Sequence, residues 1–97
     1  MRAVSLRRRR LLPQRARVVA EVLERDQQCQ ARDRLPDIDC AGPLDVHELA
    51  PRSVDPAGWL NPARAIAVCR IHHAWIGDHP LEAQALGLHR FSWELAE

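Results

Sequence analysis

The chain has 97 residues, with 14 basic and 13 acidic side chains and a formal net charge of +1. A chain of this length suits one small domain with a modest core. No apolar run approaches the roughly 20 residues of a membrane span, and the arginine-bearing N-terminus lacks the long apolar stretch of a secretory signal. These features exclude a membrane-spanning class, and we expect a soluble, cytoplasmic protein.

The charge is unevenly distributed along the chain. Residues 1–17 contain seven arginines and no acid, whereas the remainder contains seven arginines and thirteen acids. A basic arm on an acidic body is typical of a segment that binds a polyanion, because guanidinium groups match phosphate oxygens. We expect residues 1–12 to be a disordered arm that orders on binding, with a solvated terminus as the alternative. Its candidate nucleic-acid contacts are Arg7, Arg8, Arg9 and Arg10.

Residues 13–97 are predicted to form the single domain, which opens with a helix from Pro13 to about Asp26. Pro13 suits the first turn of a helix. An apolar stripe follows at helical spacing and is expected to pack on the core; it consists of Val18, Val19, Val22 and Leu23.

The middle of the chain is expected to contain two short strands between loops rich in Pro, Gly and Asp. Residues 44–49 alternate, which places Leu44, Val46 and Glu48 on one face and Asp45, His47 and Leu49 on the other. Residues 65–68 form a second short apolar run. Helical sequence then begins near Arg70 and is expected to unwind near Gly77, before a second short helix from Pro80 and a tail over 89–97.

Three cysteines and a histidine have the composition of a structural zinc site. Cys69 and His72 have the C-x-x-H spacing that lets two ligands converge on one ion at a strand-to-helix turn. Cys29 and Cys40 would complete a closed Cys3His site, and an odd cysteine count in a reducing compartment favours metal over disulfides. The alternative is that the cysteines are small buried hydrophobic residues.

The next histidine, His73, would point about 100° away from His72 on a helix and is free to serve a second site. Its expected partners are His47 and Glu48 in the first strand. Two histidines and an acid around one divalent ion are the composition of a hydrolytic metal site.

The order of these motifs resembles the small HNH endonucleases, most closely those encoded by bacteriophages of actinobacteria. The segments that carry the resemblance are "ERD..C", "GPLDVHELAPRS", "VCR.HH.WI..HP..A..LGL" and "SWE", which together span about residues 21–95. The resemblance implies an α+β fold built on a ββα-metal, treble-clef-like motif, with flanking helices and a structural zinc site. It also implies the bacterial host's cytoplasm as the location, if the chain is phage-encoded.

Residue roles follow from the same resemblance. Cys29, Cys40 and Cys69 match three cysteines of the family's zinc site, and His72 stands where the fourth usually is. His73 and His47 match ligands of the catalytic ion. Two positions complete the comparison: Glu48 stands where the general base is expected, and Arg52 matches an arginine near the DNA backbone.

This chain departs from the family pattern at three places. Glu48 replaces the histidine that usually acts as the general base. Glu48 could itself be the base, or it could be a ligand of the metal ion. Alternatively, His47 could be the base, with Asp45 or Glu48 as the metal ligand. Arg64 occupies the position of the family's asparagine, whose orienting role Asn61 could take three residues earlier. Gly77 replaces a second helix histidine, so that Asp78 or His79 is a possible extra metal ligand.

The resemblance implies metal-dependent hydrolysis of DNA phosphodiesters, with structural zinc and a catalytic Mg²⁺, Mn²⁺, Ni²⁺ or Zn²⁺ ion. Arg52, Arg64 and Arg70 are candidates to hold phosphates, and phage terminase subunits are implied as partners. Two other hypotheses remain open. One is a non-catalytic zinc-binding DNA module with a degenerate site, and the other is a partner-binding protein that uses the surface of Trp59, Trp75 and Trp93.

Overall fold

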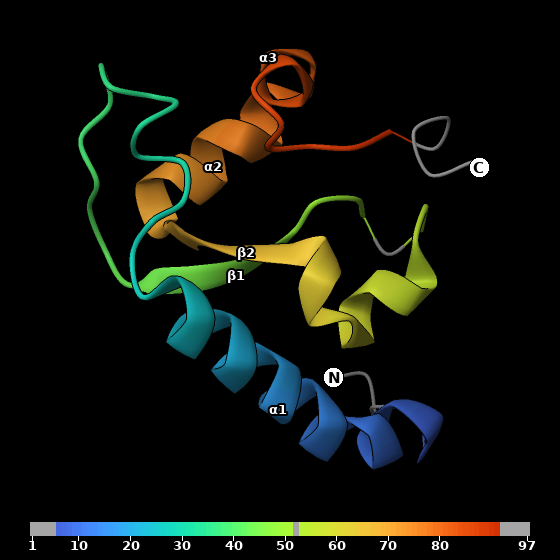
Figure 1. Ribbon diagram of the computed structural model, residues 1–97. Coiled ribbons are helices and arrows are strands. Elements are labelled where there is room, and N and C mark those ends of the chain that lie inside the picture. Colours follow the sequence, from blue (N-terminus) through green and yellow to red (C-terminus); the bar gives the residue numbers. More distant parts are fainter. Residues whose placement is uncertain (1–5, 52, 92–97) are drawn as a thin grey trace, which may run out of the picture.

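The computed structural model describes residues 6–51 and 53–91, with the side chains of residues 6–8 excepted. The elements follow the order α1 (Leu6–Asp26), β1 (Leu44–Glu48), two 3-10 turns (Pro56–Leu60 and Pro62–Arg64), β2 (Ala65–Cys69), α2 (Arg70–Asp78) and α3 (Pro80–Ala85). Figure 1 shows the short sheet in the middle of the molecule, with α1 on one side of it and α2 and α3 on the other. The fold is a small α+β domain.

Strands β1 and β2 form a two-stranded antiparallel sheet in which Leu44 pairs with Cys69 and Glu48 pairs with Ala65. Both strands lie close to their predicted positions. Because β2 passes directly into α2, the end of the sheet and the start of the helix are fixed relative to each other.

The alternation of β1 divides the molecule into two layers, as the sequence predicted. Val46 packs toward α1, in a cluster with Val18 and Val22 of that helix and Ala65 and Ala67 of β2. The opposite face of β1 is turned toward α2. Its side chains are therefore the ones that can meet the histidines of that helix.

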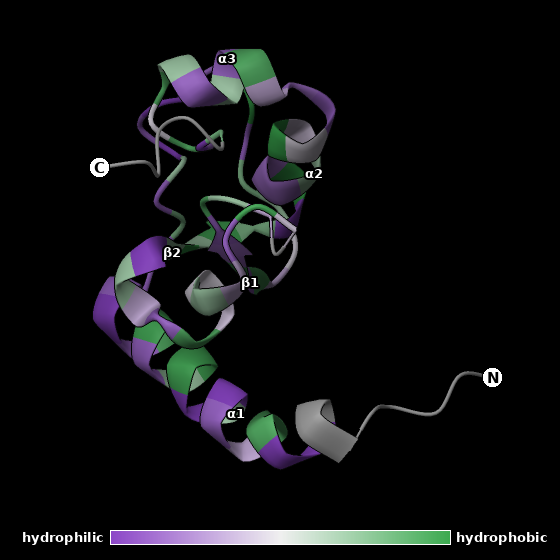
Figure 2. Cartoon of the chain, turned by 90° about the vertical axis from the view of Figure 1, so that its right-hand side faces the viewer, coloured by the Kyte–Doolittle hydropathy of each residue, from purple (hydrophilic) through white to green (hydrophobic). Residues whose placement is uncertain are grey.

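The second cluster lies between β2, α2, α3 and the long loop after α1. Its largest fully buried side chains are those of Val68, Ile76 and Leu88. Removing such side chains from water is the main source of stability in a domain of this size. Apolar and hydrophilic residues alternate along the helices, so each helix presents a partly apolar face to the sheet or the loop (Figure 2).

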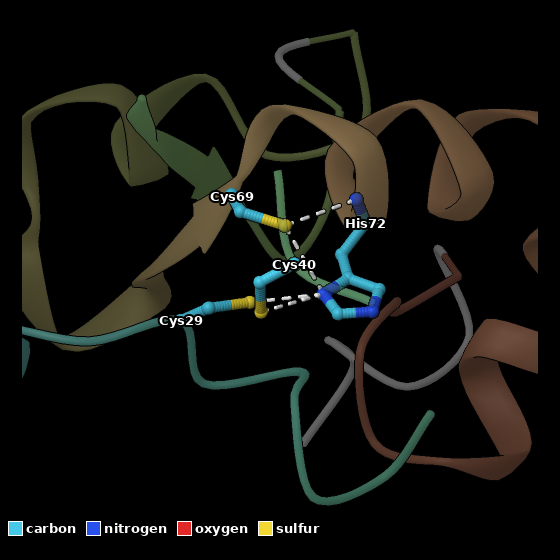
Figure 3. A group of neighbouring side chains, drawn as sticks. All are labelled: Cys29, Cys40, Cys69 and His72. Carbon is cyan, nitrogen blue, oxygen red and sulfur yellow. Dashed lines mark hydrogen bonds between the residues drawn. The ribbon is translucent and has the colours of Figure 1, made fainter. Parts of the chain in front are cut away.

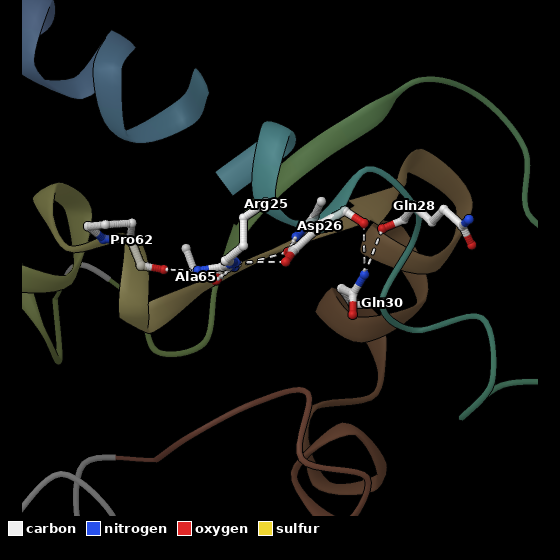
Figure 4. A network of polar contacts seen from close by, with 7 residues as sticks. Arg25, Asp26, Gln28, Gln30, Pro62 and Ala65 are labelled. Atoms are coloured by element: carbon white, nitrogen blue, oxygen red, sulfur yellow. Dashed lines mark hydrogen bonds and ion pairs between the residues drawn. The ribbon is translucent and has the colours of Figure 1, made fainter. Parts of the chain in front are cut away.

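A polar network ties the end of α1 to β2 (Figure 4). The guanidinium of Arg25 donates to the carbonyl oxygens of Pro62 and Ala65 at 2.8 and 2.7 Å, and the Asp26 carboxylate accepts from the N–H of Ala67 at 2.8 Å. The same two side chains form an ion pair at 2.7 Å, and Arg25 holds the pKa of Asp26 below its ordinary value. The network fixes where the chain leaves α1, three residues before Cys29.

One sequence expectation about the helices was wrong and another was confirmed. Helix α1 begins at Leu6 rather than at Pro13, so residues 6–12 of the expected disordered arm are helical and Pro13 lies inside the helix. The expected interruption near Gly77 is confirmed, because α2 ends at Asp78, one residue after the glycine, and α3 begins at Pro80.

None of the helices in the described part of the chain combines the length and the apolarity that crossing a membrane requires.

Candidate metal centre and histidine pocket

Four side chains from three separate segments meet beside the start of α2 (Figure 3). Cys29 and Cys40 come from the loop after α1, and Cys69 and His72 come from the junction of β2 and α2. Their ligand atoms all lie within 4.8 Å of one another, and the three sulfurs lie 3.2, 3.5 and 3.2 Å from Nδ1 of His72. Tetrahedral zinc separates its ligand atoms by roughly 3.5 to 3.7 Å. The predicted Cys3His group is therefore brought together and could hold a structural metal ion such as zinc.

The imidazole of His72 is oriented for this role. Its Nε2 lies 2.7 Å from the carbonyl oxygen of Ile38, and the residue is completely buried. A carbonyl oxygen only accepts, so Nε2 carries the proton and the Nδ1 lone pair faces the sulfurs. A hydrogen bond to the far nitrogen is the usual way in which a protein fixes a metal-binding histidine.

The cysteines also show why a cation suits this group. Burial of the Cys69 thiol opposes ionisation, but the N–H groups of His72 and Ala41 and the thiols of Cys40 and Cys29 outweigh it and lower its pKa to about 7. Desolvation and the neighbouring sulfurs raise the pKa of Cys40 to about 12. Without a cation, Cys40 is therefore held in its thiol form beside an ionisable Cys69, and a bound metal ion would favour ionisation of both.

His73, the next residue of α2, points into a different environment. Its ring lies edge-on to the ring of His47, with 5.2 Å between the centroids and 65° between the planes. Both side chains line a pocket of about 480 Å³ between β1, α2 and the segment after α3. The rings of the two neighbouring histidines of α2 therefore lie in separate surroundings, as their spacing predicted.

His47 is held in one tautomer at the base of this pocket. Its Nε2 lies 2.7 Å from the carbonyl oxygen of Leu88, so Nε2 carries the proton and Nδ1 keeps its lone pair. Burial lowers the pKa of His47 to about 4, against the opposing effect of the Leu88 carbonyl. The ring is neutral at pH 7.

His73 is oriented by a carboxylate. Asp45 lies two residues before His47 on the same face of β1, and its Oδ2 is 3.5 Å from Nδ1 of His73. The guanidinium of Arg70 contacts both carboxylate oxygens, at 3.0 and 3.3 Å, and holds the pKa of Asp45 below its ordinary value. The ionised carboxylate accepts a hydrogen bond from Nδ1–H of His73, so Nε2 is the ring nitrogen that Asp45 does not hold.

Glu48 lines the same pocket but comes from the α1 side of the strand. Its Oε1 lies 3.5 Å from the guanidinium of Arg15, which also donates to the carbonyl oxygen of Trp59. Arg15 thus brings helix α1 to the edge of the pocket. No pattern in the sequence distinguishes this arginine from the others of the basic segment.

The other predicted site residues lie elsewhere. Asn61 accepts from the N–H of Ala63 at 3.0 Å and caps a 3-10 turn, and Arg64 forms an ion pair at 2.7 Å with buried Asp55. His79 donates to the Trp75 carbonyl and stacks on the Trp75 ring, with centroids 4.6 Å apart. None of these side chains lines the pocket, and neither does Asp78. Arg70, as described above, is engaged with Asp45.

The predicted DNA contacts are described only in part. Arg9 and Arg10 are exposed on α1. The side chains of Arg7 and Arg8, and the whole of Arg52, lie outside the described residues.

The residue that sequence reasoning missed is His89. It lines the pocket together with His47 and His73, although it lies more than 40 residues after the strand histidine. No sequence motif marks His89, because its position depends on how the segment after α3 packs against the end of β1.

Comparison with known proteins adds no assignment, because no protein-family model, curated protein or solved structure matches this chain.

Proposed function

We propose that this chain is a divalent-metal-dependent DNA endonuclease of the HNH type, built on a Cys3His zinc scaffold. The observation that carries the proposal is the pairing of His47 on β1 with His73 on α2 across an open pocket. It agrees with the resemblance of "VHEL.PRS" and "CR.HH.WI" to that family.

The donor set of the pocket fits a divalent cation. The Nδ1 lone pair of His47 is available because its Nε2–H donates to the Leu88 carbonyl, and Nε2 of His73 is left for the ion because its Nδ1–H donates to Asp45. Neutral imidazoles whose second nitrogen is held by an acceptor are typical metal ligands. His47 and His73 would hold the ion, which leaves positions for a phosphate oxygen and a water molecule.

A divalent ion bound there would supply Lewis-acid stabilisation of the charge that develops on the scissile phosphate. The protein side chains have separate tasks. Glu48 lines the pocket and is proposed to accept the proton of the attacking water. Arg15, next to Glu48, contributes positive charge where the phosphate would enter.

DNA is the proposed substrate because of the charge on α1. Arg9, Arg10 and Arg17 are exposed on this helix, and Arg15 extends the basic surface to the pocket. Arginine contacts with phosphates give affinity that falls as salt concentration rises and carry no sequence information. Cleavage by this chain alone is therefore proposed to depend weakly on sequence, with specificity from a partner such as a phage terminase.

A non-catalytic zinc-binding DNA module is the second candidate. It is favoured by the distribution of potential metal ligands. Within residues 6–51 and 53–91, three or more His, Cys, Asp or Glu side chains come close enough to hold one ion only at the Cys3His group. The pocket histidines would then be remnants, and α1 would bind DNA without cleavage.

Plasmid nicking with Mg²⁺, Mn²⁺, Ni²⁺ or Zn²⁺ separates the two candidates. Wild-type protein is compared with His73→Ala and Glu48→Ala, and with His79→Ala as a control, since His79 is an exposed histidine just after α2 and outside the pocket. If the chain is a nuclease, His73→Ala and Glu48→Ala should lose nicking activity, and His79→Ala should nick as well as the wild type. Equal activity in all four proteins would point to a contaminant, and inactive wild-type protein that still binds DNA would favour the second candidate.

A further inference from the structure

The segment after α3 holds His89 in a fixed position at the pocket. The carbonyl of Leu88, the residue before it, accepts from Nε2 of His47 at 2.7 Å, and the N–H of Arg90, the residue after it, donates to the carbonyl of Leu49 at 2.7 Å. Leu88 is itself completely buried in the second core cluster. The backbone on both sides of His89 is thus attached to the end of β1.

The side chain of His89 is also restrained. It is half-buried, and the ring of Phe91 meets its ring edge-on, with 4.6 Å between centroids and 76° between planes. The pocket wall also includes Gly77, where an added Cβ would meet nothing within 4 Å. With a volume of about 480 Å³, the pocket has room for a ligand larger than a single ion.

The pocket lining offers hydrogen-bond donors that suit an anion. Its lining contains Arg15 and three imidazoles, against one carboxylate, Glu48, which already lies near Arg15. An imidazole can donate an N–H to a phosphate oxygen in either its neutral or its charged form. Groups of this kind position a nucleic-acid backbone without reading its bases.

The geometry does not assign His89 to the metal ion. Across the described part of the chain, no group of three ligand atoms includes His89 with His47 and His73. We infer that His89 is a substrate-binding residue, whose imidazole donates to a phosphate of the bound DNA strand next to the one that is cleaved. This inference rests on the proposed function and names a contact that the sequence did not predict.

The test compares His89→Ala, His89→Gln and His79→Ala in zinc-loaded protein. Binding of a short DNA duplex is measured without a second metal, and KM and kcat for nicking are measured with Mn²⁺. Because a hydrogen bond to a charged group contributes about ten-fold or more to binding, His89→Ala is expected to raise the dissociation constant and KM about ten-fold and to change kcat less than about two-fold. The amide of His89→Gln can still donate, so this variant should recover part of the affinity.

Three results would overturn the inference: unchanged KM and duplex affinity in both His89 variants, a lower kcat with unchanged KM, or weaker Mn²⁺ binding in His89→Ala. In each case wild-type nicking persists, so the proposed function survives. A wild-type protein that binds duplex without cleaving it removes the nuclease proposal, while the duplex affinities alone still decide the His89 contact. If the wild-type protein neither binds nor cleaves the duplex, both the nuclease proposal and the His89 contact are overturned.

Discussion

His72 and His73 are adjacent on one helix, yet they lie in opposite kinds of site. The imidazole of His72 is completely buried among three sulfurs, in a group with four protein ligands and no open position. The imidazole of His73 is 41% exposed and lines a pocket with room for other molecules. A closed ligand set suits a scaffold, and an open one suits chemistry.

In both places a hydrogen-bond acceptor holds one nitrogen of the histidine, but the acceptors differ. The Ile38 carbonyl holds the far nitrogen of His72, and the half-buried carboxylate of Asp45 holds Nδ1 of His73. A neutral carbonyl suits the Cys3His group, where ionised sulfurs would bring negative charge. An anionic acceptor would strengthen His73 as a ligand of the proposed second ion, which has few other candidate ligands.

The largest effect is expected from loss of the closed site. A structural zinc ion contributes roughly 10 kcal/mol or more to folding, which is comparable to the whole stability of a small domain. Chelation, or Cys69→Ser, should therefore abolish cooperative thermal unfolding followed by circular dichroism, and added zinc should restore it after chelation only. An unchanged melting curve in chelator would show that the fold does not depend on a metal.

The next largest effect should separate the two histidines by function. His72→Cys retains a four-ligand zinc site and should keep nicking activity within a few-fold of wild type. His73→Ala removes a proposed ligand of the second ion and should lower nicking by about a hundred-fold or more, with little change in melting temperature. Plasmid nicking and melting curves on the same samples check both. If His72→Cys lost nicking activity while His73→Ala kept it and melted at a lower temperature, the roles of the two residues would be the opposite of those proposed.

A pH effect of intermediate size is expected from His47. Its folded pKa of about 4 lies below the ordinary value of 6.5, so the unfolded chain binds more protons between these values and stability falls as pH falls through that window. Between pH 7 and pH 5 the loss should be about 2 kcal/mol in the absence of a second metal.

Denaturant unfolding of wild type and His47→Asn at the two pH values checks this effect. The variant lacks the titrating group, so its stability should fall by correspondingly less. Identical pH dependence in both proteins would mean that His47 is not desolvated as described.

The smallest effect is expected at Asp45. Asp45→Asn keeps the size of the side chain but removes its charge, and should weaken Mn²⁺ or Co²⁺ binding in the pocket about ten-fold without changing the zinc content. Calorimetric titration and elemental analysis measure the two quantities. If the variant loses zinc, or binds the second metal as tightly as the wild type, Asp45 does not orient His73 as a ligand of that metal.

The sequence was most informative where local spacing determines geometry. The alternation of residues 44–49 predicted how the side chains of β1 divide between its two faces, and the adjacent positions of His72 and His73 predicted that their rings diverge. The Cys3His group was also predicted. The prediction was weaker for Cys29 and Cys40 than for Cys69 and His72, because ten residues separate the two cysteines.

The sequence was least informative where contacts join distant segments. Arg64 and Arg70 look like free cations in the sequence, but Asp55 and Asp45 engage them in the structure. Asn61 looks like an orienting group, but it caps a local turn. His89 reaches the pocket only because the chain after α3 is attached to the end of β1, which no local pattern encodes.

The division of labour between the two neighbouring histidines is tested most directly by counting bound zinc ions with native mass spectrometry. We expect one tightly held zinc per chain in wild type and in His73→Ala, and a marked loss of zinc in His72→Ala. Zinc retained by His72→Ala but lost from His73→Ala would contradict the account.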